Sequence, residues 1–233
     1  MSREHRRVQL APGYILHHWP YRDTSRILEV LTRDHGRITL FARGVRGPKA
    51  KLASVLQPFQ LILVSWSGRG DAAQLTGAET AGYGEPLPPA CLMSAFYLNE
   101  LLLKLTTRHD PLPAVFDDYQ LALQRLHAGA PEAPLRIFEK RLLETLGYGL
   151  DLTRIEVNAY YYFRPGQGLL ASEADTAGAL AGRSLMCLAA EQLEEPRVLE
   201  DARRLLRAAL TECLEGRELR TRTVARSIAE KRQ

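Results

Sequence analysis

Residues 25–51, SRILEVLTRDHGRITLFARGVRGPKAK, predict a β-hairpin followed by a basic loop. The first part consists of two apolar segments joined by Asp34-His35-Gly36, a combination that is typical of a turn. The second segment alternates, so that Ile38 and Leu40 lie on one face of the strand and Phe41 lies on the other.

The end of this stretch is strongly cationic. Arg43, Arg46, Lys49 and Lys51 are separated by glycine and proline, which supply backbone angles that other residues resist. Four cations on an exposed loop between two strands suit a polyanion, because they can hold phosphate groups electrostatically. The alternative is a solvated loop that binds nothing.

Three further apolar runs surround the hairpin and the loop. They cover residues 13–17, where Trp19-Pro20 follows as a strand end, then residues 59–66 and residues 73–81. Five strands without a long helix predict an OB-fold barrel over residues 1–82. An OB-fold binds oligonucleotides on one face and through its loops.

The composition changes at the proline-rich residues 82–89, and residues 83–233 are predicted to form a helical domain. Apolar residues spaced by three and four predict helices at 95–105, 115–126, 135–146, 182–193 and 196–216, with a short one in the tail. Near residues 158–171 the helical pattern is replaced by that of a small β-hairpin. The predicted class is therefore an α+β multidomain protein.

Charge and cysteine content limit the possible functions. The 233 residues have a net charge of +4, and residues 1–80 alone contain twelve Lys and Arg against six Asp and Glu. Cys91, Cys187 and Cys213 lie in apolar helical patterns, so we expect buried thiols in a reducing compartment. The N-terminus lacks the apolar core of a secretory signal, and no apolar run approaches 18 residues. We expect a cytoplasmic protein with no membrane partner.

The sequence favours a binding protein over an enzyme. It contains no phosphate-binding P-loop, no nucleophile elbow and no HExxH motif, and its cysteines lack zinc-site spacing. His17 and His18 are adjacent on a strand and face opposite ways, so they cannot share a metal ion. We expect no cofactor. A metal-dependent nuclease, whose carboxylates the fold would bring together, and an RNA-binding OB protein remain the alternatives.

Cations and aromatic residues also cluster around the predicted barrel loops. Arg22 and Arg26 share the first inter-strand loop with Trp19 and Tyr21, and single-stranded nucleic acid requires rings on which bases stack beside cations that neutralise phosphate. Trp19 could instead pack in the core. The predicted nucleic-acid-binding residues are Tyr21, Arg22, Arg26, Arg37, Arg43, Arg46, Lys49, Lys51 and Arg69.

The third predicted helix offers a different kind of surface. Arg136 and Lys140 lie one turn apart beside an apolar stripe, and Leu143 follows on the next turn. Such a strip suits a short acidic and hydrophobic peptide. The alternative is an ordinary surface helix in which Arg136 and Lys140 pair with Glu139 and Glu144.

Seven short segments, in this order, resemble the RecO family of bacterial recombination mediators over nearly the whole chain. They are Arg22-Asp-Thr-Ser25, Gly36-Arg37 with Ala42-Arg-Gly44, Leu56-Gln-Pro-Phe59, Tyr97-Leu-Asn-Glu-Leu101, Leu135-Arg136 with Phe138-Glu139, Leu146-Gly147-Tyr148 and Leu219-Arg-Thr-Arg222.

The resemblance implies an OB-fold that binds single- and double-stranded DNA, and annealing of complementary strands in the cytoplasm, in association with the nucleoid. It also implies work with RecR to load RecA on DNA coated by the single-stranded-DNA-binding protein, whose acidic C-terminal tail the helical domain would capture. Arg136 matches the family's tail-binding arginine, whereas Lys140 and Leu143 follow from helical spacing only. Many family members have two cysteine pairs that form a zinc site, but residues 153–164 contain no cysteine, so zinc is not expected.

Overall fold

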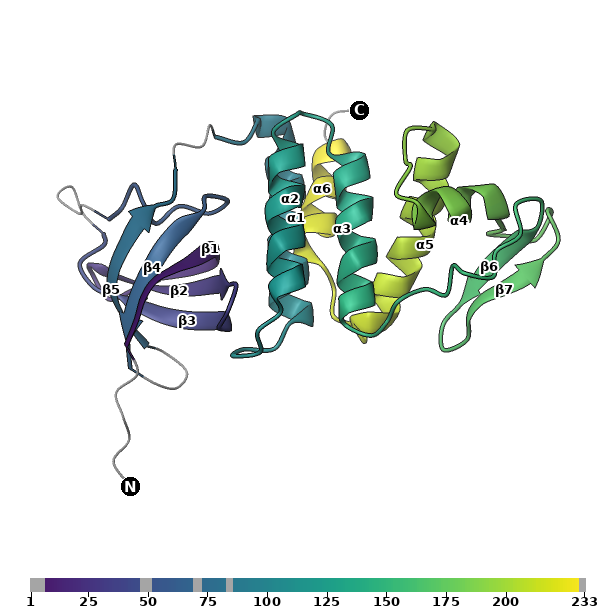
Figure 1. Ribbon diagram of the computed structural model, residues 1–233. Helices are drawn as coiled ribbons and strands as arrows, with labels where there is room; N and C mark the ends of the chain where they lie inside the picture. The colour runs from purple at the N-terminus through teal and green to yellow at the C-terminus, as the bar shows by residue number, and fades with distance from the viewer. Residues whose placement is uncertain (1–6, 47–51, 69–72, 83–85, 231–233) are drawn as a thin grey trace, which may run out of the picture. The chain divides into compact units, whose positions relative to one another are not determined.

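The computed structural model describes residues 7–46, 52–68, 73–82 and 86–230 (Figure 1). It divides into two compact units, one of Met1–Leu87 with Ala95–Asp117 and the other of Pro88–Ser94 with Asp118–Gln233. The first unit thus contains, besides the barrel region, a helical segment that the sequence analysis placed in the second domain.

The first unit contains a closed five-stranded barrel, which confirms the predicted fold class. Its strands are β1 (Arg7–Tyr21), β2 (Ser25–Thr32), β3 (Gly36–Ala42), β4 (Ile62–Ser67) and β5 (Ala73–Thr80). Their order around the barrel is β1-β2-β3-β5-β4. Neighbouring strands are antiparallel except β3 and β5, which run parallel where the barrel closes.

The predicted hairpin is present as β2 and β3. Leu28 pairs with Leu40 and Val30 pairs with Ile38, and all four side chains are buried in the barrel core. Because alternate residues of a strand point to opposite faces, the residues between these, such as Glu29 and Thr39, lie on the outer face of the barrel.

The bounds of the first and fourth strands differ from the prediction, and the first strand already starts at Arg7 instead of Gly13. The first strand extends through Trp19 and Pro20 to Tyr21, because Pro20 lies in the part of β1 that pairs with β2 alone. Proline is tolerated there because no second strand pairs with that end of β1, so the missing N–H of Pro20 removes no hydrogen bond to such a strand. The fourth strand starts at Ile62, after Phe59 has taken a left-handed backbone with φ of 66°.

The outer face of the hairpin contains a fully buried carboxylate. Glu29 is 0% exposed and accepts hydrogen bonds from Thr39 Oγ1 at 2.7 Å, from Arg37 Nη1 at 2.9 Å and from the Arg108 guanidinium. Arg37 also donates through Nη2 to the carbonyl of Thr106 at 2.7 Å. This cluster therefore ties β2 and β3 to the segment around residues 106–108.

The same segment approaches the hairpin turn closely. The His109 N–H donates to the carbonyl of Arg37 at 2.9 Å, and Arg37 and Arg108 form a parallel β-bridge. Elsewhere in the first unit, the buried Asn99 Nδ2 donates to the carbonyl of Leu16 at 2.8 Å. Polar contacts as well as apolar packing thus attach residues 95–117 to the barrel.

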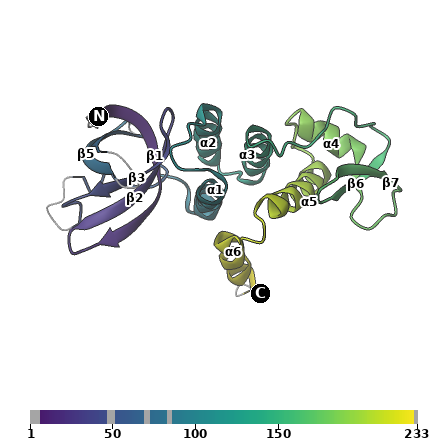
Figure 2. The ribbon, with the colours of Figure 1, turned by 90° about the horizontal axis from the view of Figure 1, so that it is seen from below.

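The rest of the chain is mostly helical, as predicted. Its helices are the 3-10 turn η1 (Pro89–Cys91), α1 (Leu92–Leu105), α2 (Pro113–Leu126), α3 (Glu132–Thr145), α4 (Gly182–Ala189), α5 (Pro196–Cys213) and α6 (Arg220–Glu230). Within the second unit, α5 packs against both α3 and α4 (Figures 1 and 2).

The small hairpin expected near residues 158–171 is also present. It consists of β6 (Tyr160–Arg164) and β7 (Gly168–Ser172), and β6 pairs on its other side with the two-residue strand β8 (Leu180–Ala181). β8 was not predicted, because two residues are too few to show a period.

The cysteine prediction holds only in part. Cys91 and Cys213 are buried free thiols, but Cys187 on α4 is partly exposed, so the expectation of three buried thiols is wrong for that residue. None of the described helices is both long enough and apolar enough to cross a membrane.

Two glycines provide a matched test of the close approach at the hairpin turn. Gly36 and Gly44 have left-handed φ angles of 66° and 64°, but a Cβ at Gly36 would lie 2.3 Å from the carbonyl oxygen of Asp110, whereas at Gly44 it would meet no described atom within 4 Å. We expect Gly44→Ala to lower the free energy of unfolding by about 1 kcal/mol. Gly36→Ala should lower it by about 3 kcal/mol or more, because overpacking adds to the backbone strain. Urea unfolding followed by circular dichroism would measure both, and equal losses would contradict the close approach.

Candidate nucleic-acid interface

The turn between β1 and β2 presents Tyr21 and Arg22 on the outside of the barrel. Arg22 has a left-handed backbone with φ of 51°, which is unusual for a residue with a side chain. Arg46, from the loop after β3, holds this turn: its N–H donates to the carbonyl of Thr24 at 3.0 Å and its Nη1 donates to the carbonyl of Arg22 at 3.1 Å. The two loops that contain most of the predicted cations are therefore joined to each other.

Aromatic rings and guanidinium groups alternate next to this turn. The rings of Tyr21 and Phe41 meet edge to face, with centroids 5.0 Å apart. The guanidinium carbon of Arg22 lies 5.4 Å from the Tyr21 centroid, and that of Arg43 lies 5.5 Å from the Phe41 centroid. Both distances are within the range of cation–π contacts, which orient the arginines over the rings.

Trp19 extends this row of rings along the sheet. Trp19, Ile27 and Phe41 are register partners across β1, β2 and β3, and Trp19 is 42% exposed. His17 meets Trp19 edge to face at 4.4 Å. Burial lowers the pKa of His17 below its ordinary value, although the Glu29 carboxylate acts in the opposite direction, so a neutral imidazole supports the Trp19 ring at pH 7. We call Trp19, Tyr21 and Phe41, with Arg22, Arg43 and Arg46, the barrel surface.

The barrel surface has the groups needed to bind single-stranded nucleic acid. Arg22, Arg43 and Arg46 are exposed, and within the described ranges none of them forms an ion pair with a carboxylate. Unpaired arginines can therefore contact phosphates, while exposed rings can stack on bases.

The other predicted cations have different surroundings. Arg26 is half-buried on β2, opposite Pro20. Arg37 does not join the barrel surface, because its side chain is only 11% exposed and is paired with the buried Glu29, so we leave it out of the interface. Lys49, Lys51 and Arg69 lie outside the described residues.

Sequence reasoning left out two aromatic residues of this surface. Phe41 was assigned to the face opposite Ile38 and Leu40, which is the outer face of the barrel, but it was not included among the binding residues. Trp19 was left between core packing and binding. The alternation of β3 was the signal that could have identified Phe41.

The candidate peptide site on α3 is ion-paired. Arg136 Nη2 lies 2.8 Å from Glu139 Oε1, and Lys140 Nζ lies 3.1 Å from Glu144 Oε1. Both pairs are those of the alternative interpretation, and Lys140 also contacts a second carboxylate, that of Glu191, at 3.4 Å.

The exposure of Leu143 and the hydrogen bonding of Arg136 determine which groups of α3 could bind a peptide. Leu143 is 1% exposed and faces the interior, so in this conformation it cannot contact a peptide. Arg136 Nε is buried and has no hydrogen-bond partner among the described residues. Arg136 therefore keeps an unused donor in spite of its pair with Glu139.

A further arginine on α3, which the sequence analysis did not single out, holds the second unit together. Arg141 donates through Nη1 to Asp118 Oδ1 at 2.7 Å, and through Nε and Nη2 to the two carboxylate oxygens of Glu191 at 2.7 and 2.6 Å. These bonds join α2, α3 and the turn that follows α4. Hydrogen bonds from Arg141 hold the pKa of Glu191 below its ordinary value.

Arg141→Gln should reveal this contribution through its pH dependence. The folded-state pKa of Glu191 is lowered, so the stabilisation is complete above the ordinary value near 4.5 and is lost as the pH falls through the folded-state pKa. We expect the variant to lose about 2 kcal/mol at pH 7, and the difference from the parent to shrink below pH 4.5. The control is Arg183→Gln, which breaks an exposed pair and should cost less than about 1 kcal/mol. A loss from Arg141→Gln that is constant from pH 7 to pH 3 would contradict this role.

No metal centre accompanies these sites in the part of the chain that the structure describes, where no three His, Cys, Asp or Glu side chains are grouped to hold an ion. The barrel with its row of rings and unpaired arginines defines the class of the protein as an OB-type protein equipped for nucleic acid.

Comparison with known proteins identifies the family. Residues 7–83 match the family described as Recombination protein O N terminal, and residues 90–223 match Recombination protein O C terminal. The chain belongs to the RecO family, which confirms the resemblance seen in the seven segments.

Curated relatives match over most of their length. A protein of Methylococcus capsulatus named DNA repair protein RecO is 42% identical over 230 residues, which cover 95% of this chain and 94% of the relative. Proteins of the same name from Nitrosococcus oceani and Coxiella burnetii are 43% and 39% identical, over 93% of this chain and 92% and 97% of their own.

Proposed function

We propose that this protein is a non-enzymatic, DNA-binding mediator of homologous recombination and DNA repair. In this role it binds single- and double-stranded DNA, anneals complementary strands in the cytoplasm at the nucleoid, and works with RecR to load RecA on DNA coated by the single-stranded-DNA-binding protein. The observation that supports the DNA-binding part is the contact of Tyr21 and Phe41 with each other and with Arg22 and Arg43. The family and the names of the relatives support the repair role.

In the proposed DNA complex the barrel surface supplies two kinds of contact. Bases stack on the exposed rings of Trp19 and Tyr21, and each stacked base contributes roughly 1–3 kcal/mol. Arg22, Arg43 and Arg46 neutralise phosphates, and from the sequence we add Arg26, Lys49, Lys51 and Arg69 to the cations along the strand. Neither kind of contact depends on the identity of the base, as a protein that coats and anneals arbitrary strands requires.

The proposed partner site is on α3. An acidic peptide that ends in phenylalanine would direct a carboxylate at the guanidinium group of Arg136 and compete with Glu139 for it, while the buried Nε, which has no partner among the described residues, would become accessible only if the Arg136 side chain turned outward. Lys140 adds positive charge nearby, although Glu144 and Glu191 already offset it. Leu143 takes part only by supporting the helix from its buried side.

The two contributions to DNA binding can be separated by salt dependence. We expect replacement of Arg22, Arg43 and Arg46 together by Ala to flatten the slope of log K against log[salt] by about 2 on single-stranded DNA, since each phosphate contact contributes about 0.7. Trp19→Ala should lower the affinity by roughly 1–3 kcal/mol and leave the slope unchanged, because stacking releases no counterion.

Fluorescence anisotropy of a labelled oligonucleotide measures both effects. The control variant is Arg33→Ala, because Arg33 is already paired with Asp117 and should contribute nothing to the slope. An unchanged slope in the triple variant would place the DNA elsewhere. Preference for RNA over single-stranded DNA of the same sequence would instead favour the RNA-binding alternative.

Opposite changes at one ion pair test the partner site. Arg136→Gln should weaken binding of a fluorescent acidic peptide ending in phenylalanine by about tenfold or more. Glu139→Gln should strengthen binding, because it frees Arg136 from its competitor. Both glutamines preserve size and polarity, and circular dichroism would confirm that each variant is folded. Binding of bare DNA should not change in either variant, and equal peptide affinities of the two variants would refute the proposed site.

A further inference from the structure

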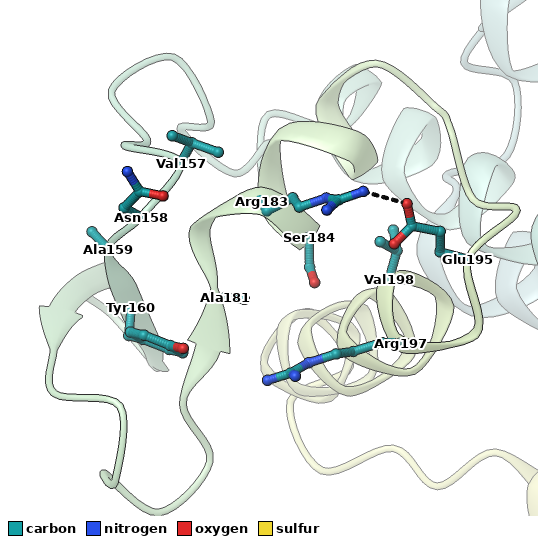
Figure 3. A pocket seen from close by; sticks show the side chains of 10 residues that line it. All are labelled: Val157, Asn158, Ala159, Tyr160, Ala181, Arg183, Ser184, Glu195, Arg197 and Val198. Atoms are coloured by element: carbon teal, nitrogen blue, oxygen red, sulfur yellow. Dashed lines mark hydrogen bonds and ion pairs between the residues drawn. The ribbon is translucent and has the colours of Figure 1, made fainter.

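A cavity of about 300 Å³ lies within the second unit, between the small β-sheet and the first turns of α4 and α5 (Figure 3). It is remote in sequence from the barrel surface and includes no residue of α3. Neither the proposed DNA contacts nor the proposed peptide site uses it.

Both helices that begin at this cavity lack the usual cap. Neither α4 nor α5 has a side-chain hydrogen bond at its N-cap, and neither has an acidic residue in its first turn. The first-turn N–H groups of a helix have no partner within the helix, and the helix dipole makes this end positive. Two such ends at one cavity favour an anion between them.

The side chains in these first turns increase the positive charge. Arg183 occupies the first turn of α4 and Arg197 that of α5, where cations are normally unfavourable. Arg183 is paired with Glu195, the N-cap residue of α5, whose carboxylate also lines the cavity and is offset by that pair. Arg197 has neither an ion pair nor a hydrogen bond within the described residues, and its guanidinium group extends across the cavity toward the hydroxyl of Tyr160 (Figure 3).

A buried hydroxyl group gives independent evidence for a ligand. Ser184 is only 3% exposed, and its hydroxyl points into the cavity (Figure 3). In the described part of the chain this hydroxyl has no hydrogen-bond partner. Because this hydroxyl opens onto the cavity and has no partner in the described residues, it is free to donate to a ligand atom there.

We propose that this cavity binds a phosphate group. Its donors converge from three directions, namely the start of α4 with Ser184, the start of α5, and the side chain of Arg197. A phosphate has several acceptor oxygens in a tetrahedral arrangement, which matches such a set better than the planar carboxylate group does. The volume is greater than a phosphate group alone requires and leaves room for the attached sugar, so the phosphate belongs to a nucleotide, either free or at the 5′ end of a DNA strand.

Binding of small probes to the full chain tests this site. Isothermal titration calorimetry should detect binding of deoxyadenosine 5′-monophosphate and of inorganic phosphate but not of deoxyadenosine. Arg197→Ala and Ser184→Ala should each weaken binding of the monophosphate about tenfold or more. Arg203→Ala is the matched control, because it removes an exposed arginine of the same helix that does not line the cavity, and it should leave binding unchanged.

Two oligonucleotides distinguish the source of the phosphate. If the site holds a strand end, a 5′-phosphorylated oligonucleotide should bind more tightly than the same strand with a 5′-hydroxyl, and Arg197→Ala should abolish the difference. If the two strands bind equally while the monophosphate still binds, the site holds a free nucleotide. Equal binding of deoxyadenosine and its monophosphate, no binding of either phosphate probe, or an equal loss in Arg203→Ala would overturn the proposal. None of these results affects the barrel surface, whose DNA binding is measured with separate variants.

Discussion

The buried carboxylate of Glu29 is the interaction on which the first unit depends. A charge with no access to water is tolerated only when it is paired and fully hydrogen-bonded, and Arg37, Thr39 and Arg108 satisfy that requirement. Removal of one partner from such a pair typically costs 3–5 kcal/mol. Because the partners come from β3 and from the segment after α1, the charge can be accommodated only when the hairpin and that segment have met.

This cluster also divides the outer face of the hairpin into two regions. Toward the β2–β3 turn, Glu29, Arg37 and Thr39 are covered by the segment that contains Arg108, so these three side chains serve the attachment of that segment. Toward the β1–β2 turn, the next residues on the same face are Ile27 and Phe41, beside the exposed rings of Trp19 and Tyr21. One part of this sheet face thus holds the segment that contains Arg108, and the other part is exposed to solvent.

The sequence was sufficient to predict the barrel because Leu28 and Val30 in β2, like Ile38 and Leu40 in β3, are two residues apart, so that a shift by one residue would expose all four together. The same alternation could not reveal the role of Arg37. An arginine on an outward-facing strand position has the same local pattern whether it meets DNA or a buried glutamate, and Glu29 becomes buried only through a residue 79 positions away. For α3, helical spacing brought Arg136 near Glu139 and Lys140 near Glu144, but it could not show the second carboxylate at Glu191, which comes from the turn after α4. Long-range ion pairs decide which cations are available, and they follow from the fold and not from local pattern.

The parallel contact between β3 and β5 has a consequence for synthesis of the chain. It consists of the register pairs Leu40 with Ala73 and Phe41 with Gln74, and Gln74 Nε2 donates to the carbonyl of Phe41 at 2.9 Å. Such a contact forms late, because it must close a long loop, whereas the β2–β3 hairpin can form locally. Phe41 is thus fixed in place only after the last strand of the barrel has been made. A nascent chain on the ribosome therefore exposes its cations before the Phe41 ring is ordered. At that stage the chain can be attracted electrostatically to ribosomal RNA, but it cannot yet bind a nucleic-acid strand by stacking on the barrel surface.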